Sequence, residues 1–221
     1  MKESMENHHP DRKDFQIDRI ILFTDAVFAI AITLLIIEIK VPEIAHDATD
    51  GDFFRALLQL LPKFMGFAVS FFIIGLYWFI HHKMFGYVIN YTPKLIWLNL
   101  IFLFSIVLMP FSTAVYSEYS TEAHIHLVAP YAVYVINICF TGVMNYVLLN
   151  YIYNEKNGIA EYVPDKKSQV AAKQRAMAIP VVFLVSLLLT CIWPAWGRMF
   201  LFVIPVVIRM LAPAKKKKKP N

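Results

Sequence analysis

The chain has 221 residues, of which 58% are hydrophobic and only 17% are charged, and its mean hydropathy is +0.55. This balance excludes an ordinary soluble domain and indicates an integral membrane protein. The formal net charge is +5, but the sequence has no patterned basic and aromatic surface of the kind that binds nucleic acid, so no nucleic-acid partner is expected.

Apolar stretches of near-spanning length recur along the chain. A helix needs about 20 apolar residues to cross a bilayer. We therefore expect an all-α integral membrane protein with six transmembrane helices in a single domain, residues 19–212, between a cytoplasmic N-terminal lead at 1–18 and a basic cytoplasmic tail at 213–221. The six predicted spans lie at about 20–40, 64–80, 95–116, 127–151, 176–193 and 196–212.

The basic residues indicate the orientation. With the N-terminus inside, 17 of the 21 Lys and Arg fall on the cytoplasmic side, and the outside keeps only Lys40, Arg55, Lys63 and Arg198. The positive-inside rule therefore predicts that both termini are cytoplasmic, which agrees with an even number of spans. The Lys215–Lys219 run is a binding site for anionic lipid, a solvated tail, or an addition that is not native to the protein.

Prolines and one acid mark the expected helix ends. Asp18 is placed as an N-cap for the first helix, which should end near position 40, just before Pro42. The stretch 53–61 is apolar but short, and Pro62 follows it, so we expect an interfacial piece or a kinked entrance to the second span. Pro110 falls inside the third span and should kink it.

The first predicted helix carries a stripe that could line a pore. At about 100° per residue, one face collects Ala26, Ile30, Thr33, Leu34, Ile37 and Glu38. Copies of this helix around an axis would form apolar rings, a hydroxyl ring and an outer carboxylate ring, which are features of gated cation pores. The alternative is ordinary helix packing, with Thr33 bonded back to the carbonyl of Ala29.

Charged groups sit at the inner end of the same helix, where ionisable side chains need partners. Arg19 and Asp25 are six residues apart, so they cannot pair along one helix. Groups on the second and third spans at the same depth could donate to Asp25 and Thr24. We expect a structural polar cluster that holds the first three spans together and contains Arg19, Phe23, Thr24, Asp25, His81, His82, Trp97 and Asn99.

The order of Arg19, three residues, Phe23, Thr24 and Asp25, followed by an apolar stretch with one Thr, resembles the first helix of the transmembrane protein 175 family of potassium channels. Trp97 and Asn99 and the six-helix plan also fit. Thr24 stands where that family most often has Ser, which leaves a hydroxyl at the position.

The resemblance implies a specific function. A single six-helix repeat is similar to the prokaryotic form of the family, a homotetramer in the plasma membrane whose pore is lined by the first helix and lacks a carbonyl filter. Ile30, Leu34 and Ile37 would then form a hydrophobic constriction, with no ranking of which is narrowest. Thr33 would help to select potassium over sodium, and Glu38 would concentrate cations at the outer mouth.

The leading hypothesis is therefore a passive potassium-permeable channel for monovalent cations, with no cofactor and no enzymatic activity. The alternative is a proton-coupled transporter or proton pathway in which Asp25 titrates together with His81 or His82. Adjacent histidines diverge on a helix, so a metal site is not expected. Cys139 and Cys191 lie in separate predicted spans and read as buried apolar residues.

Overall fold

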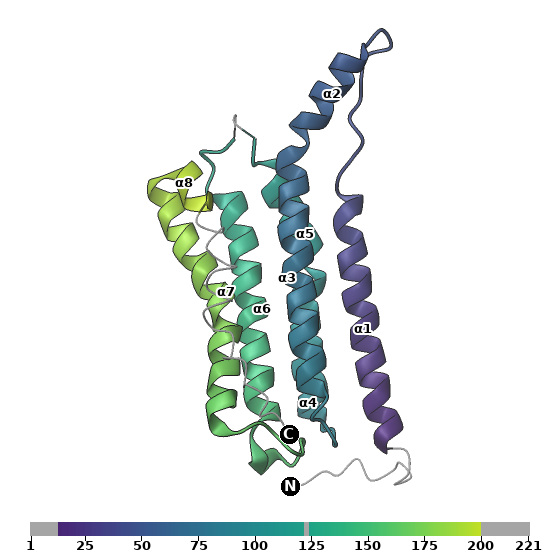
Figure 1. Ribbon diagram of the computed structural model, residues 1–221, viewed down its shortest axis with the longest axis vertical. Helices are drawn as coiled ribbons and strands as arrows, with labels where there is room; N and C mark the ends of the chain where they lie inside the picture. Colours follow the sequence, from purple (N-terminus) through teal and green to yellow (C-terminus); the bar gives the residue numbers. More distant parts are fainter. Residues whose placement is uncertain (1–12, 122–123, 200–221) are drawn as a thin grey trace, which may run out of the picture.

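The structure is a computed structural model that describes residues 13–121 and 124–199. It is an all-helical bundle in which α1 lies at one side and α7 and α8 at the other, as Figure 1 shows. The elements are α1 (Lys13–Ile37), α2 (Asp50–Gln59), α3 (Leu61–Phe85), α4 (Pro93–Val107), α5 (Met109–Glu118), α6 (Ala129–Ile152), the 3-10 helix η2 (Glu155–Asn157), α7 (Lys166–Ile192) and α8 (Pro194–Met199).

Five helical stretches within these residues are long and apolar enough to cross a membrane: Phe15–Ile37, Leu61–Phe85, Pro93–Glu118, Ala129–Ile152 and Lys166–Ile192. They match the first five predicted spans, so the chain is a multi-pass membrane protein. Most of the predicted sixth span and the whole Lys215–Lys219 tail lie outside the described residues.

The first helix is longer at its start than the sequence predicted. It begins at Lys13, so Asp18 lies inside the helix as an exposed residue and the predicted N-cap is wrong. The helix ends at Ile37, earlier than expected, where the amide of Ile39 donates to the carbonyl of Ile36 and tightens the last turn. Pro42 then favours an extended chain before it.

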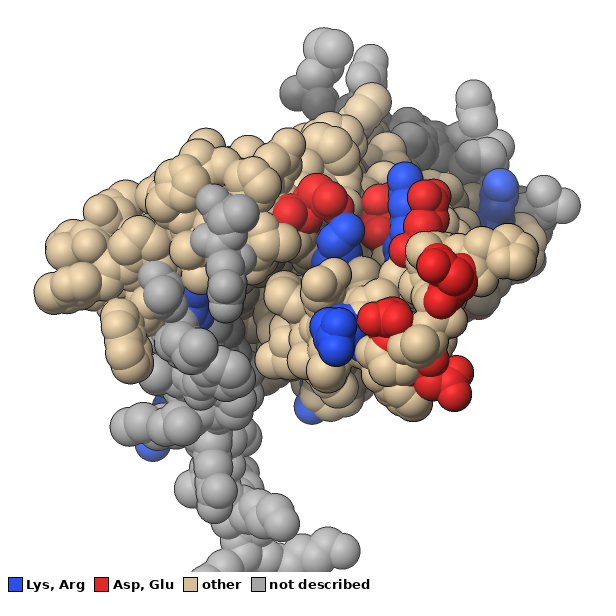
Figure 2. Space-filling model, turned by 90° about the horizontal axis from the view of Figure 1, so that it is seen from above, with Lys and Arg blue, Asp and Glu red and all other residues tan. Residues whose placement is uncertain are grey.

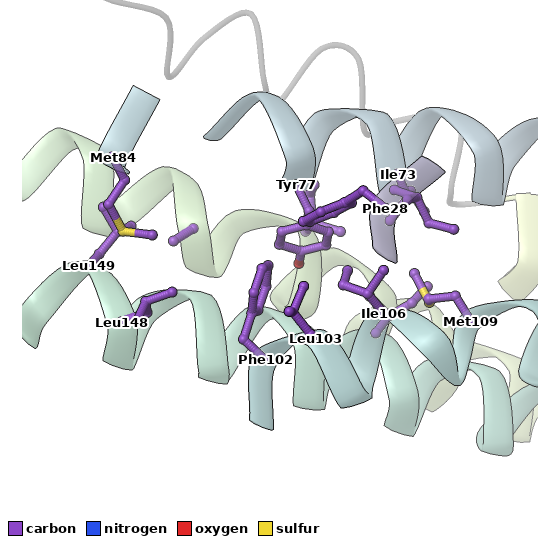
Figure 3. Close-up of a cluster of buried hydrophobic side chains, with 14 of the residues drawn as sticks. Phe28, Ile73, Tyr77, Met84, Phe102, Leu103, Ile106, Met109, Leu148 and Leu149 are labelled. Carbon is purple, nitrogen blue, oxygen red and sulfur yellow. The ribbon is translucent and has the colours of Figure 1, made fainter. Parts of the chain in front are cut away.

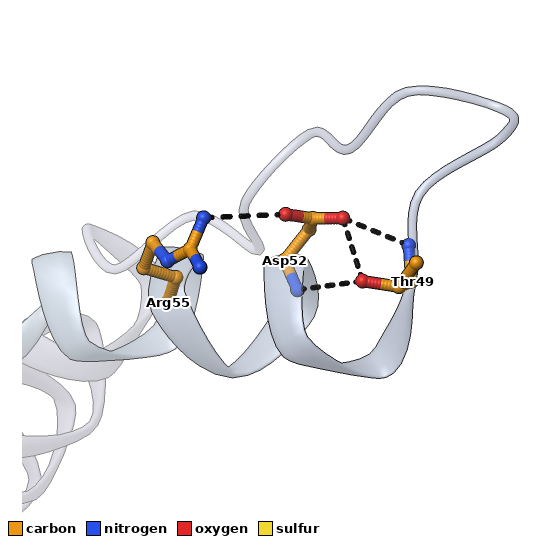
Figure 4. A network of polar contacts seen from close by, with 3 residues as sticks. All are labelled: Thr49, Asp52 and Arg55. Atoms are coloured by element: carbon orange, nitrogen blue, oxygen red, sulfur yellow. Dashed lines mark hydrogen bonds and ion pairs between the residues drawn. The ribbon is translucent and has the colours of Figure 1, made fainter.

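The stretch before the second span forms the separate helix α2. Thr49 caps it, because its hydroxyl accepts from the amide of Asp52 while the Asp52 carboxylate accepts from the amide and hydroxyl of Thr49 (Figure 4). The helical path is interrupted at Leu60, which lies between α2 and α3, and Pro62 occupies the first turn of α3. The prediction of a kinked entrance is therefore confirmed.

The third span is broken at the predicted proline. Pro110 lies in the first turn of α5, and Leu108 separates α4 from α5. Proline has no amide hydrogen to continue the ladder of α4. The amide of Leu108 instead donates to the carbonyl of Phe104, which closes the first half of the span.

The core lies between the helices, with aromatic side chains at its centre. Phe28 of α1 lies 5.9 Å from Phe102 of α4, and Phe102 lies 6.3 Å from Tyr77 of α3, measured between ring centroids. Figure 3 shows these three rings meeting among aliphatic side chains. Their packing holds α1 against α3 and α4, since packing and hydrogen bonds drive helix association within a membrane.

The connections at the end of the bundle opposite α2 are also ordered. The carbonyl of Ile159 accepts from the amides of Ile89 and Asn90 at 2.9 and 3.1 Å, and the amide of Glu161 donates to the carbonyl of Tyr87 at 3.0 Å. Ile159 is fully buried. The α6–α7 connection is therefore clamped to the α3–α4 turn.

Candidate functional site

The first helix has two distinct faces. Thr24, Phe28, Ala31 and Leu35 are at most 1% exposed and follow the three- and four-residue spacing of a helix face. This face packs on α3, α4 and α5. Other apolar residues of α1 are exposed, so one chain leaves them uncovered: Leu22, Phe23, Ile30, Leu34, Ile36 and Ile37.

The uncovered face contains the whole predicted pore stripe. Ile30, Leu34 and Ile37 are 58%, 40% and 68% exposed. The other members of the stripe, Ala26, Thr33 and Glu38, are exposed as well. None of the stripe residues is buried in the single chain.

The Thr33 hydroxyl bonds back to its own helix, although its acceptor is the carbonyl of Ile30, 2.9 Å away, and not that of Ala29. A hydroxyl has one donor hydrogen and two acceptor lone pairs. Because this bond uses the hydrogen, the lone pairs of Oγ1 stay free to face the side of α1 that the chain does not cover.

A buried polar cluster ties α1 to its neighbours. Asn99 Nδ2 of α4 donates to Thr24 Oγ1 of α1 at 2.9 Å, and Asn99 Oδ1 lies 2.9 Å from His81 Nε2 of α3. The hydroxyl of Thr24 itself donates to the carbonyl of Ile20. Because the amide oxygen of Asn99 can only accept, His81 is assigned the hydrogen on Nε2 and donates it to Asn99 Oδ1.

Aromatic rings hold the His81 side chain in place. It is 2% exposed and stacks on Phe85 at 4.1 Å and on Phe102 at 5.7 Å between ring centroids. Phe28 of α1 also lies 6.0 Å from it. The imidazole is therefore fixed in position and enclosed by the core.

Asp25 finds a partner that the sequence did not indicate. Trp78 Nε1 of α3 donates to Asp25 Oδ1 at 2.9 Å, and the indole of Trp78 stacks on His82 at 5.6 Å. Trp78 is not among the residues of the polar cluster that the sequence predicts. It lies one helical turn before His82, so it reaches the depth of Asp25.

The other predicted cluster members stand apart. Arg19 is exposed and forms no hydrogen bond or ion pair with the part of the chain that the structure describes. Phe23 and Trp97 are 54% and 65% exposed. The sequence placed them at the right depth but could not show which way each side chain points around its helix.

A second buried polar group was not predicted. The hydroxyl of Ser70 in α3 lies 2.7 Å from that of Thr113 in α5 and 2.8 Å from that of Tyr134 in α6. Ser70 and Tyr134 each stand between apolar neighbours in the sequence, and Thr113 follows Ser112. Only the relative register of α3, α5 and α6 brings them together.

No group of metal-binding side chains is found among residues 13–121 and 124–199. Cys139 and Cys191 are both free thiols. Cys191 is exposed rather than buried, because it lies on the outer side of α7, which corrects the sequence interpretation for that residue.

A known protein family matches part of the chain. The family described as "Endosomal/lysosomal potassium channel TMEM175" matches residues 19–110, which cover α1 through the start of α5.

Individual relatives extend the comparison. The chain is 41% identical over 104 residues to a potassium channel of Streptomyces collinus, which is 47% of this chain and 49% of the relative. It is 34% identical over 112 residues to the endosomal/lysosomal proton channel TMEM175 of Gallus gallus, which is 48% of this chain and 22% of the relative. The chain thus spans about half the length of the bacterial relative and less of the animal one.

The fold matches that of a solved channel. The crystal structure of a lysosomal potassium-selective channel TMEM175 homolog from Chamaesiphon minutus superimposes with a TM-score of 0.73 at 26% identity, over 90% of this chain and 99% of that one. All of these proteins are named as channels and none as an enzyme. The expectation that the chain is not an enzyme is thereby confirmed.

Proposed function

We propose that the chain is a member of the TMEM175 family and forms a potassium-permeable cation channel with passive conduction through a central pore, on the strength of its similarity to that family and to potassium channels. The pore is lined by α1 of four copies of the chain, in a prokaryotic plasma membrane. The observation that carries this proposal is the uncovered apolar stripe of α1.

The burial of the spans supports a role for α1 at an axis. Of its most apolar 18 residues, 22% are buried, against 33% to 50% in the other candidate spans. A helix that packs so little on its own chain needs lipid or further subunits to cover it. Placing α1 at the axis of a homotetramer covers part of it with neighbouring copies and turns the stripe towards the pore.

In this arrangement each stripe residue has a role. Ile30, Leu34 and Ile37 form apolar rings that gate by dewetting, and Thr33 offers its free lone pairs to a partly dehydrated potassium ion. Glu38, exposed beyond the end of α1, concentrates cations at the outer mouth. The bonds of Thr24 and Asn99 hold α1 at a fixed rotation, so that this stripe and no other faces the axis.

The proposal is tested by current through purified protein in a planar bilayer under a potassium/sodium gradient. Steady current that reverses towards the potassium equilibrium potential is expected. Thr33→Val keeps the size of the side chain but removes the oxygen, so the reversal potential should move towards zero. No conductance at all, or a reversal potential that Thr33→Val leaves unchanged, would count against the channel or against the selectivity role respectively.

The constriction has its own test. Leu34→Ser should raise single-channel conductance severalfold, because a polar ring is easier to wet than an apolar one. Ile36→Ser is the matched control, since Ile36 is also exposed, at 46%, but lies about 120° away from Ile30 around α1. Equal effects of the two variants would refute the assignment of the stripe to the pore.

A second candidate function is a proton pathway, favoured by the contact chain from Asp25 through Trp78 to His82. In this case Asp25 and His82 titrate during transport, and His81 stays enclosed in the core. Uptake into liposomes that is driven by a pH gradient, without steady potassium current, and that Asp25→Asn abolishes, would favour this function over the channel.

A further inference from the structure

A cavity of about 270 Å³ opens at the α2 end of the bundle, between the last turns of α1 and α5 and the first turns of α3. Leu35, Phe67 and Ala114 give it an apolar wall. It lies on the bundle side of α1, behind the buried residue Leu35, and Glu38 is the one residue that it shares with the stripe assigned to the pore.

The electrostatics of this cavity favour a positive charge. Both α1 and α5 end at it, so the carbonyl ends of two helices converge there, and the C-terminal end of a helix dipole attracts cations. Glu38 and Glu118 add two carboxylates to the lining. Lys63 Nζ donates to Glu118 Oε2 at 2.6 Å and neutralises that one.

Glu38 remains unneutralised. It makes no hydrogen bond or ion pair with any residue that the structure describes. Lys40 also lines the cavity but is exposed at its rim. Acidic side chains, with basic ones among them, gather on one side of this face of the molecule, as Figure 2 shows from above. Those on α2 and the loop before it are Glu43, Asp47, Asp50 and Asp52.

A buried hydroxyl in the same lining lacks a partner. Ser117 of α5 is 6% exposed, and its Oγ has no hydrogen-bond partner in the described part of the chain. An unpaired buried hydroxyl is costly in a folded protein and calls for an explanation. It is an acceptor within the lining that a donor group could use.

We propose that this cavity binds a small organic ammonium ion, with its charged group at Glu38 and its apolar body against Leu35, Phe67 and Ala114. The size of the cavity and its partly apolar lining fit such a molecule better than a bare alkali ion. A bare ion would make no favourable contact with the apolar wall. Phe67 contributes an aromatic side chain to the lining, and aromatic rings attract ammonium groups.

Occupancy of this site bears on α1 directly, because Leu35 and Glu38 belong to its last turn or lie just beyond it. If α1 lines the pore, a bound ammonium ion alters the position of its outer end and the current. This last step rests on the proposed function, whereas binding itself does not.

The test is a fluorine NMR titration of 4-fluorobenzylammonium against the purified full-length chain in detergent. Saturable binding is expected. The neutral analogue 4-fluorobenzyl alcohol, of nearly the same shape, should bind about tenfold more weakly because it lacks the charge. Equal binding of the two compounds, or no saturable binding, overturns the proposal.

Two variants locate the site. Ala114→Leu fills the cavity and should weaken binding about tenfold or more, while Glu38→Gln should weaken it severalfold without adding bulk. Glu43→Gln is the control, because Glu43 lies in the nearby loop but does not line this cavity. Unchanged affinity in Glu38→Gln, or an equal loss in Glu43→Gln, refutes the site.

The binding test and the conduction test can fail independently of each other. Absence of current without any ligand refutes the channel and leaves the binding result intact. Absence of binding, in a protein that conducts, refutes the ammonium site alone.

Discussion

Replacing Asn99 by Leu should destabilise the folded chain by about 1–3 kcal/mol, since it removes two interhelical hydrogen bonds that are each worth about 0.6–1.7 kcal/mol inside a membrane. The loss falls unequally on the two partners. Thr24 keeps its bond to the carbonyl of Ile20 at 2.8 Å, whereas His81, at 2% exposure, loses the acceptor for Nε2. Most of the effect should therefore come from His81.

A double-mutant cycle isolates that part. His81→Phe keeps an aromatic ring against Phe85, now 4.1 Å from the imidazole, but removes the polar nitrogen. Unfolding in SDS at fixed protein concentration should give a coupling energy between His81→Phe and Asn99→Leu of about 0.6–1.7 kcal/mol. Trp97→Leu, at an exposed position of α4, is the control and should change stability by less than about 0.5 kcal/mol. Additive single effects would refute the cluster as an energetic unit.

Two further predictions concern close packing and pH. A Cβ at Gly66 would clash with Ser117 Oγ but would lie 3.5 Å from Ser117 Cβ. Gly66→Ala should therefore lower the free energy of unfolding in SDS by about 1–3 kcal/mol, and Ser117→Ala in the same chain should restore most of this loss. Failure of this rescue would show that the clash lies elsewhere. The hydroxyl and amide of Thr49 hold the pKa of Asp52 below its usual range. The stability that the Asp52 carboxylate contributes by capping α2 is therefore fully present above its ordinary pKa of about 3.9. It is lost as the pH falls through the lowered pKa that Asp52 has in the folded chain. The chemical shift of the Thr49 amide in NMR spectra should stay constant from pH 7 to about 5 and change below about pH 4. Asp52→Asn should abolish this change. A transition above pH 5 would contradict a lowered pKa for Asp52.

The sequence predicted the spans well because hydropathy and proline position depend on local residues. The break at Pro110 and the separate helix before Pro62 follow from the chemistry of proline alone. The start of α1 was missed, because Asp18 is as acceptable on an exposed helix surface as at an N-cap.

Side-chain partners were harder to predict than spans. Thr24, His81 and Asn99 could be grouped by depth, and they do meet. Depth does not specify rotation, so Trp97 was included although it points outward, and Trp78 was overlooked. The rotation of each helix is fixed by packing across the whole bundle, which no single segment encodes.

The clamp at Ile159 has a consequence for how the protein is made. The side chain of Asn90 also donates to the carbonyl of Gly158, 68 residues further along the chain. At a synthesis rate of about 5–20 residues per second, the α3–α4 turn waits roughly 3–14 s for these acceptors to leave the ribosome. The first helices are thus inserted before the contact that joins them to the later ones can exist, and the two halves of the bundle become one unit only late in biogenesis.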